Sequence, residues 1–155
     1  MPHVIFVCTA NICRSPVAEA VLRQRFQERG LESWTVGSAG TWAEEGRPAS
    51  TYSVQVAAAR GLDISDHRAR LVTREMLAQA DLVLCMTEGH AEALRAEFPT
   101  QAAKIYLLTE MAGKHYNISD PYGRSLRDYE QMAAEVMALI DEGLPRILEI
   151  GKANW

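Results

Sequence analysis

Apolar and polar residues follow one another along the chain in blocks that predict strands and helices in turn. Short apolar runs, rich in β-branched residues, predict strands over residues 3–7, 34–36, 81–86 and 105–108. Apolar residues that recur at the spacing of one helical face predict helices over residues 16–29, 51–60, 88–98 and 126–144. Strands that alternate with helices are typical of a parallel sheet with right-handed crossovers. We therefore expect an α/β fold: a doubly wound, four-stranded parallel sheet with helices on both faces, in a flavodoxin-like three-layer sandwich.

Capping residues mark where two of these helices begin. Ser15 stands before the first helix as its expected N-cap, and Pro16 occupies a first-turn position where proline is tolerated. Ser125, with Asp128 three positions later, forms a capping signal for the last helix. The apolar stripe of that helix, which includes Met137, is predicted to lie in the core.

Composition and charge narrow the class of protein. The chain has 155 residues, 48% of them hydrophobic and 23% charged, and a formal net charge of −4. A chain of this length can bury enough surface to form a single domain, residues 1–155, without disulfides or a metal. The three cysteines do not suit a secreted disulfide framework, and no apolar run is long enough to span a membrane. We therefore expect a cytoplasmic protein with no membrane contact, and the acidic balance argues against nucleic acid as a partner.

Doubly wound folds bind ligands beyond the carboxyl ends of their strands. Three polar loops follow predicted strands at that edge, over residues 8–15, 38–42 and 111–122. The first has the most specific chemistry. It leads into a helix, so its backbone N–H groups can point at one phosphate-sized anion. Arg14 adds a fork of two donors for phosphate oxygens, and these positive surroundings favour the thiolate form of Cys8, a nucleophile.

Two further residues complete this chemistry. Asn11 is among the few residue types other than glycine that accept a left-handed backbone, so it can lock a tight loop. Attack by sulfur on a phosphoester expels an oxyanion, which needs an acid to protonate it. Asp120 follows the fourth strand and is the candidate for that acid, because Pro121 stiffens its loop and Tyr122 could stand beside an aromatic leaving group.

Two motifs together resemble the low-molecular-weight protein tyrosine phosphatases. They are Val7-Cys8-Thr9-Ala10-Asn11-Ile12-Cys13-Arg14-Ser15-Pro16 and Asp120-Pro121-Tyr122-Gly123. The resemblance extends to the chain length and to two shorter segments, Ser38-Ala39-Gly40-Thr41 and Asp66-His67-Arg68-Ala69-Arg70. One departure is Ala10, where the family usually has glycine. If the backbone there needs a positive φ, Ala10 would carry strain of about 1 kcal/mol.

The resemblance implies roles for individual residues. It implies that Cys8 forms a thiophosphoryl intermediate, that Arg14 clamps the phosphate, and that Asp120 acts first as acid and then as base. Supporting roles are implied for Ser15, which would hydrogen-bond the thiolate, and for Ser38 and His67, which would hold Asn11. The remaining residues expected around the substrate are Thr9, Ala10, Ile12, Cys13, Trp42 and Tyr122.

The same resemblance implies the partners of the protein. The expected substrate is a phosphotyrosine protein, for example a bacterial tyrosine kinase, with inorganic phosphate as product or inhibitor. No cofactor and no metal are expected. A zinc site at Cys8 and Cys13 with His3 is disfavoured, because zinc sites usually pair closer cysteines with a second pair of ligands.

Several residues allow two interpretations. Cys13 could form a reversible disulfide with Cys8 or be a small packing residue. Trp42 could be a wall of the cleft or simply a loop aromatic. Cys85 lies in the middle of an apolar strand and is expected in the core, whereas no partner can be named for His90.

Three other functions compete with phosphotyrosine hydrolysis. Arsenate reductases share this fold and anion loop but use further cysteines after the third strand, and Cys85 has no such companion. Phosphoarginine hydrolysis occurs in similar proteins that have threonine where this chain has Ile12, and the apolar Ile12 favours an aromatic ester. A phosphate-binding module without turnover is disfavoured because the candidate nucleophile, clamp and acid are all present.

Overall fold

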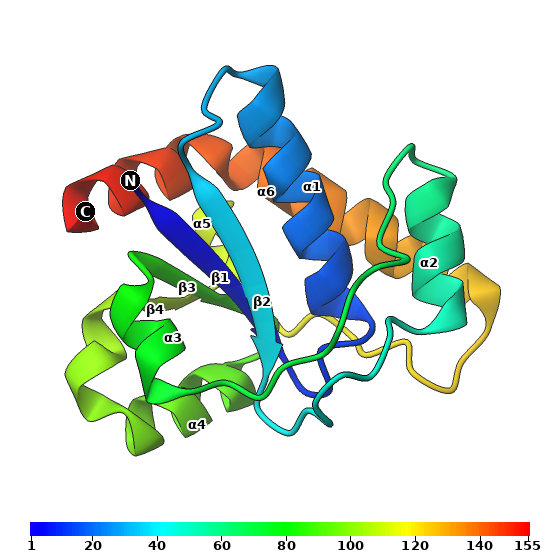
Figure 1. The fold of residues 1–155 in the computed structure, drawn as a ribbon, viewed down its shortest axis with the longest axis horizontal. Coiled ribbons are helices and arrows are strands. Elements are labelled where there is room, and N and C mark those ends of the chain that lie inside the picture. Colours follow the sequence, from blue (N-terminus) through cyan, green and yellow to red (C-terminus); the bar gives the residue numbers. More distant parts are fainter.

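A computed structural model describes residues 1–155 as a parallel sheet between two layers of helices (Figure 1). The sheet has four strands in the order β2-β1-β3-β4, and every neighbouring pair is parallel. The strands are β1 (His3–Cys8), β2 (Thr35–Gly40), β3 (Leu82–Cys85) and β4 (Ile105–Leu107). This architecture confirms the predicted doubly wound α/β fold.

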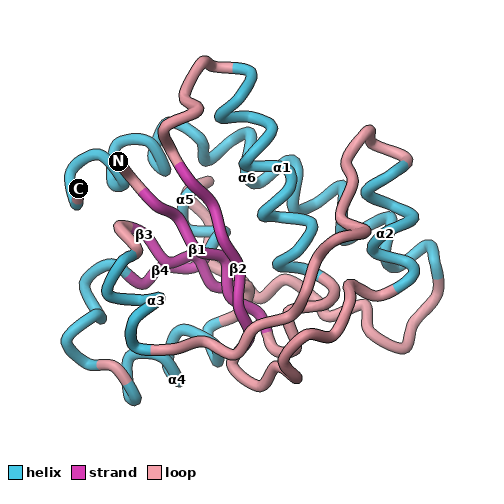
Figure 2. Tube along the Cα trace, viewed as in Figure 1, coloured by secondary structure: helices cyan, strands magenta, loops and turns pink.

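Helices cover both faces of the sheet (Figure 2). They are α1 (Arg14–Glu28), α2 (Thr51–Ala58), α3 (Arg74–Gln79), α4 (Glu88–Glu97), the 3-10 helix η1 (Pro99–Lys104), α5 (Leu108–Met111) and α6 (Leu126–Asn154). Alternate residues of β1 feed two separate cores, because successive side chains of a strand point to opposite faces. Val4 and Phe6 pack with α1 and α6, whereas Ile5 and Val7 pack with α3 and α4.

The second strand is longer than the sequence pattern predicted. The expected strand over residues 34–36 begins at Thr35 and continues to Gly40. Gly37, Ser38 and Ala39 are buried and pair in register with β1. Apolar patterning missed this half of β2, because small residues fill the space where α1 and the following loops press closely against the strand.

Three short helices were not predicted, and the ends of three more strands differ from the prediction by one residue. β1 ends at Cys8 rather than Val7, and β3 spans Leu82–Cys85 rather than residues 81–86. α3, η1 and α5 contain four to six residues each, too few for a helical period to show in the sequence. The fourth strand ends at Leu107 rather than Leu108, which is the first residue of α5. The helix predicted over residues 51–60 ends at Ala58.

Helix starts were predicted with mixed success. Ser125 and Asp128 form the expected capping box at the start of α6. Ser15, in contrast, is not an N-cap: α1 begins at Arg14, and the capping position belongs to Cys13, whose side chain makes no capping bond. The hydroxyl of Ser15 is used elsewhere, as described below.

The last helix extends beyond its predicted stripe to Asn154 and contains Pro145. Most of the stripe is buried, but Met137 is only partly so. Close packing of α6 requires small residues, since a side chain at Gly151 would come within 2.9 Å of the Trp34 ring. No helix is long and apolar enough to cross a membrane.

Candidate active site

A pocket of about 190 Å³ opens at the carboxyl edge of the sheet. Its lining combines residues from the loop after β1 with residues from two later loops: Cys8, Thr9, Ala10, Ile12, Cys13, Arg14, Arg47, Asp120 and Tyr122. All of these residues except Arg47 belong to the predicted catalytic and substrate-binding set. The sequence prediction missed Arg47, because an exposed arginine in a polar loop gives no signal of its own.

Asn11 holds the loop in shape from its centre. It is fully buried and is the one residue other than glycine with a positive φ, 58°. Its side-chain amide donates to Ser15 Oγ at 2.8 Å and to Ser38 Oγ at 2.9 Å, and its Oδ1 accepts the backbone N–H of Arg70 at 3.0 Å. His67 Nε2 donates to the Asn11 carbonyl at 2.6 Å. These bonds tie Asn11 to three segments of the chain: the start of α1, β2, and the loop that carries His67 and Arg70.

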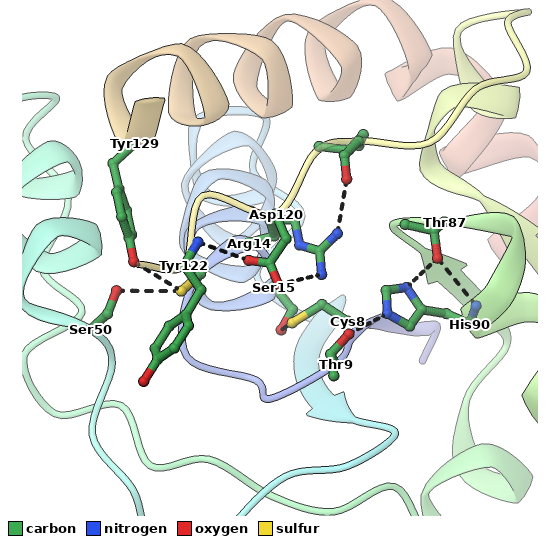
Figure 3. Close-up of polar contacts among 12 residues, drawn as sticks. Cys8, Thr9, Arg14, Ser15, Ser50, Thr87, His90, Asp120, Tyr122 and Tyr129 are labelled. Carbon is green, nitrogen blue, oxygen red and sulfur yellow. Dashed lines mark hydrogen bonds and ion pairs between the residues drawn. The ribbon is translucent and has the colours of Figure 1, made fainter. Parts of the chain in front are cut away.

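This arrangement orients the hydroxyl of Ser15 toward Cys8. Ser15 Oγ accepts a hydrogen bond from Asn11, so its own O–H is free to donate to Cys8 Sγ, which lies 2.9 Å away (Figure 3). Ser38 Oγ likewise accepts from Asn11 and donates to Glu19 Oε1 at 2.5 Å. Asn11 is thus the donor at the start of two chains of hydrogen bonds. One leads through Ser15 to the Cys8 sulfur, and the other leads through Ser38 to the Glu19 carboxylate.

Arg14 is almost completely buried at the base of the pocket, with 3% of its side chain exposed. Its Nη1 donates to the Ile118 carbonyl at 2.8 Å, and its Nη2 lies 3.6 Å from Asp120 Oδ2 (Figure 3). The Nε atom is buried and has no hydrogen-bond partner in the protein. A buried guanidinium with a free donor beside the pocket suits an oxyanion, because buried donors are normally paired.

The opposite side of the pocket is exposed to solvent. Asp120 and Tyr122 have 48% and 55% of their surfaces exposed. Asp120 Oδ1 accepts the backbone N–H of Tyr122 at 3.0 Å, which fixes the turn between them. The Arg47 guanidinium lies 5.7 Å from the centre of the Tyr122 ring and donates to its hydroxyl at 3.2 Å. Tyr122 and Arg47 therefore form one wall at the mouth of the pocket.

Other predicted residues lie further away. Trp42 is 84% exposed and does not line the pocket, and neither do Asn11 and Ser15, which act through the contacts above. Ala10 lines the pocket without a positive φ, so the strain considered for it does not arise.

The cysteines differ in surroundings. Cys13 lines the pocket, and its Sγ lies 3.4 Å from the Tyr129 hydroxyl and 3.6 Å from Ser50 Oγ (Figure 3). Burial raises the pKa of Cys13, and burial together with the Cys13 contact raises the pKa of Tyr129 to about 12. Cys8 and Cys13 are both free thiols in this structure. Cys85 is fully buried in β3, as expected of a core residue.

His90 is a further residue of the site that the sequence did not reveal. It lies in the first turn of α4 and is 7% exposed. Its Nε2 lies 2.8 Å from Thr9 Oγ1, and its Nδ1 lies 3.0 Å from Thr87 Oγ1. Burial lowers the pKa of His90 to about 4, with a further lowering by the charge of Arg14. The available signal was its position three residues after the capping residue Thr87, which directs it to the ligand edge of the sheet.

No three His, Cys, Asp or Glu side chains lie close enough together to hold a metal ion. The polar groups at the pocket include two donors, the buried guanidinium of Arg14 and the hydroxyl of Ser15 directed at sulfur, beside the sulfur of Cys8 and the carboxylate of Asp120. This set is suited to a bound oxyanion next to a nucleophilic sulfur.

Comparison with known families gives the class of protein. The family model of the low molecular weight phosphotyrosine protein phosphatases matches residues 3–152. The chain belongs to this family.

Relatives in the family carry two kinds of name. The chain is 36% identical over 148 residues to the probable low molecular weight protein-tyrosine-phosphatase EpsP of Ralstonia nicotianae, covering 96% of this chain and 97% of that protein. It is 34% identical over 138 residues to the protein-arginine-phosphatase of Bacillus subtilis, covering 88% and 91% of the two chains. A crystal structure of a low molecular weight protein tyrosine phosphatase from T. tengcongensis superimposes with a TM-score of 0.90 at 41% identity, covering 94% of this chain and 99% of that one.

Proposed function

We propose that this protein hydrolyses phosphotyrosine in proteins through a cysteinyl-phosphate intermediate, with Asp120 as general acid and base. The observation that carries the proposal is the buried sulfur of Cys8 next to Ser15, in a pocket that also holds Arg14. The hydroxyl can donate to the sulfur, and the guanidinium can donate to the oxygens of a phosphate held beside it.

Hydrolysis would take place in two steps, formation and breakdown of the cysteinyl phosphate. In the first step, the Cys8 thiolate attacks phosphorus, an S–P bond forms, and the P–O bond to the tyrosine oxygen breaks while Asp120 gives that oxygen a proton. In the second step, water attacks phosphorus and gives a proton to the Asp120 carboxylate. The S–P bond then breaks, which restores the thiolate and releases inorganic phosphate. The 3.6 Å contact between Asp120 and Arg14 supports this, because it places the carboxyl group beside the phosphate clamp.

Phosphoarginine is the second candidate substrate, since one relative is named a protein-arginine-phosphatase. Three residues of this pocket favour phosphotyrosine, an aromatic ester, instead. Ile12 gives the pocket an apolar wall, and Arg47 at its mouth opposes a positively charged guanidinium. Tyr122, packed against Arg47, offers a ring for an aromatic leaving group.

The proposal is tested by hydrolysis of p-nitrophenyl phosphate. Wild type should release p-nitrophenol, and Cys8→Ser should lose at least about 10⁴-fold in kcat, because the hydroxyl lacks the reactivity of the thiolate. Cys85→Ala is the matched control, since it removes a thiol that lies outside the pocket, and it should remain active. Turnover that persists in Cys8→Ser would assign the nucleophile elsewhere.

Substrate class is tested with one peptide that carries either phosphotyrosine or phosphoarginine. Wild type should prefer the phosphotyrosine peptide in kcat/KM, and Ile12→Thr should shift that ratio toward phosphoarginine. A wild-type preference for phosphoarginine would overturn the substrate proposal while leaving the cysteine chemistry intact.

A further inference from the structure

A buried chain of three side chains connects the start of α4 to the anion loop. His90 stands between Thr87 and Thr9, with one ring nitrogen close to each hydroxyl (Figure 3). Thr87 also caps α4 by accepting the backbone N–H of His90 at 3.2 Å. Thr9 lines the pocket, whereas Thr87 and His90 do not.

The hydrogen bonds of this chain pair both ring nitrogens of His90. A neutral imidazole has one donor nitrogen and one acceptor nitrogen, and a threonine hydroxyl can donate one hydrogen bond and accept two. Thr87 Oγ1 accepts the backbone N–H of His90 and still has a lone pair and its O–H for the contact with Nδ1. Thr9 Oγ1 can likewise donate to Nε2 or accept from it. Both hydroxyls therefore hold the ring, whichever nitrogen carries the proton.

Thr9 is held from its other side by β2 and the loop after it. Its carbonyl accepts the backbone N–H of Trp42 at 2.9 Å. The same carbonyl passes so close to Gly40 that a side chain there would lie 2.4 Å from it. With its backbone fixed by these contacts, the side chain of Thr9 is the part of the residue that His90 controls.

We propose that His90 is a positioning residue, which fixes the Thr9 side chain as the part of the pocket wall that receives the leaving group. The inference rests on the proposed function, because it concerns the group that hydrolysis releases. His90 does not touch the reacting atoms, since both ring nitrogens are occupied and the ring lies outside the pocket lining.

The chemistry of His90 supports a fixed rather than a titrating role. The charged groups that influence it are Arg14 and Asp120, and burial is the larger cause of its lowered pKa. With a pKa of about 4, His90 is neutral over the range in which phosphatase assays are run. The charge of His90 and its two hydrogen-bond partners are therefore constant during turnover.

Two substitutions separate the two contacts of His90. His90→Gln places an amide nitrogen near the position of Nε2 and keeps a donor for Thr9. His90→Asn places its amide near Nδ1, so it keeps a partner for Thr87 and loses the contact with Thr9. The matched change on the other partner is Thr9→Val, which removes the hydroxyl at nearly constant shape.

Steady-state kinetics with p-nitrophenyl phosphate should distinguish these variants. Loss of one oriented hydrogen bond predicts that His90→Asn and Thr9→Val each raise KM about five-fold, while His90→Gln stays within about two-fold of wild type. The kcat should change by less than about two-fold in all of them. Breakdown of the phosphoenzyme sets kcat, and it follows departure of the leaving group. The double variant Thr9→Val/His90→Asn should be no worse than Thr9→Val, since both changes remove the same contact.

Inhibition by inorganic phosphate gives the second readout. Its Ki should stay within about two-fold of wild type in His90→Asn, because phosphate has no leaving group to contact Thr9. A rise of KM and Ki together would show that His90 holds the loop as a whole, and an unchanged KM would show that it only stabilises the fold; either result overturns the proposal. If wild type itself fails to hydrolyse the substrate, the proposed function is wrong, which is a different outcome from unequal variants of an active enzyme.

Discussion

The two sides of the pocket are built differently. The loop after β1 is largely buried, and its central residue, Asn11, is hydrogen-bonded to three segments of the chain. The side that carries Asp120, Tyr122 and Arg47 is exposed, and its contacts are a turn, a ring and a guanidinium at the surface. With the proposed function, we expect the buried side to fix the geometry of the phosphate, which is common to all substrates, and the exposed side to meet the part of the substrate that varies.

This difference also concerns energy. Polar groups of the buried side have no water to replace a lost partner, so removing one leaves another unsatisfied. Exposed groups exchange a lost partner for water at little cost. Substitutions on the buried side should consequently affect both stability and rate, and substitutions on the exposed side should affect rate alone.

Asn11→Ala is expected to have the largest combined effect. It removes the partners of Ser15, Ser38 and the Arg70 backbone, and it places alanine at a φ of 58°. We expect a loss of about 3 kcal/mol in the free energy of unfolding and at least about 10²-fold in kcat/KM. Urea denaturation and an aryl phosphate assay measure the two. A stable but inactive variant would show that Asn11 acts on catalysis alone.

Asp120→Asn should lower kcat by about 10²-fold, because the leaving oxygen then has no acid to protonate it and the water that attacks the phosphoenzyme has no base. Stability should change by less than about 1 kcal/mol, since Asp120 is half exposed and Arg14 keeps the Ile118 carbonyl. Inorganic phosphate should inhibit the variant at least as strongly as wild type, as a negative charge facing the anion has been removed. An unchanged kcat would exclude Asp120 as the acid.

The buried imidazole of His90 makes stability depend on pH. Its pKa is about 4 when folded, below the ordinary 6.5, so the unfolded chain binds more protons between these values. The contribution of neutral His90 is therefore complete above pH 6.5 and is lost as pH falls toward 4. This predicts a loss of about 2 kcal/mol from pH 7 to pH 5.

The matched comparison is urea denaturation of wild type and His90→Gln at these two pH values. The part of the pH dependence that belongs to His90 should disappear in the variant, because glutamine does not titrate. Equal slopes for the two proteins would show that other groups cause the dependence.

Arg47→Gln should have the smallest effect. Arg47 is exposed, and its contact with Tyr122 contributes little to folding, so the unfolding midpoint should stay unchanged. A rise in KM of about three-fold for the phosphotyrosine peptide is expected, as a cation at the pocket mouth attracts a dianionic substrate. Kinetics at low and high salt measure this, and the difference between the two proteins should shrink at high salt.

Sequence patterns predicted the parts of the site that lie on regular elements. Cys8 ends an apolar strand and Arg14 starts a periodic helix. The sequence alone therefore placed the anion loop between them at the ligand edge of the sheet. The C-terminal half of β2, residues 37–40, could not be predicted in this way, because its buried residues are small and show no apolar alternation.

Contacts between distant segments account for the remaining misses. His90 meets Thr9 across 81 positions, and Arg47 meets Tyr122 across 75. Local patterning contains no information about such pairs, because they depend on how the elements pack. The same reason explains Trp42, for which the sequence allowed a cleft wall and the structure shows an exposed loop side chain outside the pocket.

Gly40 sets a limit on how this protein can diverge or be redesigned. Since a methyl group at that position would overlap the Thr9 carbonyl, the end of β2 and the entry to the anion loop can only change together. Libraries that aim at new phosphoesters should leave residue 40 untouched and randomise the solvent-facing rim at Arg47 and Tyr122, where many side chains fit without moving the sulfur.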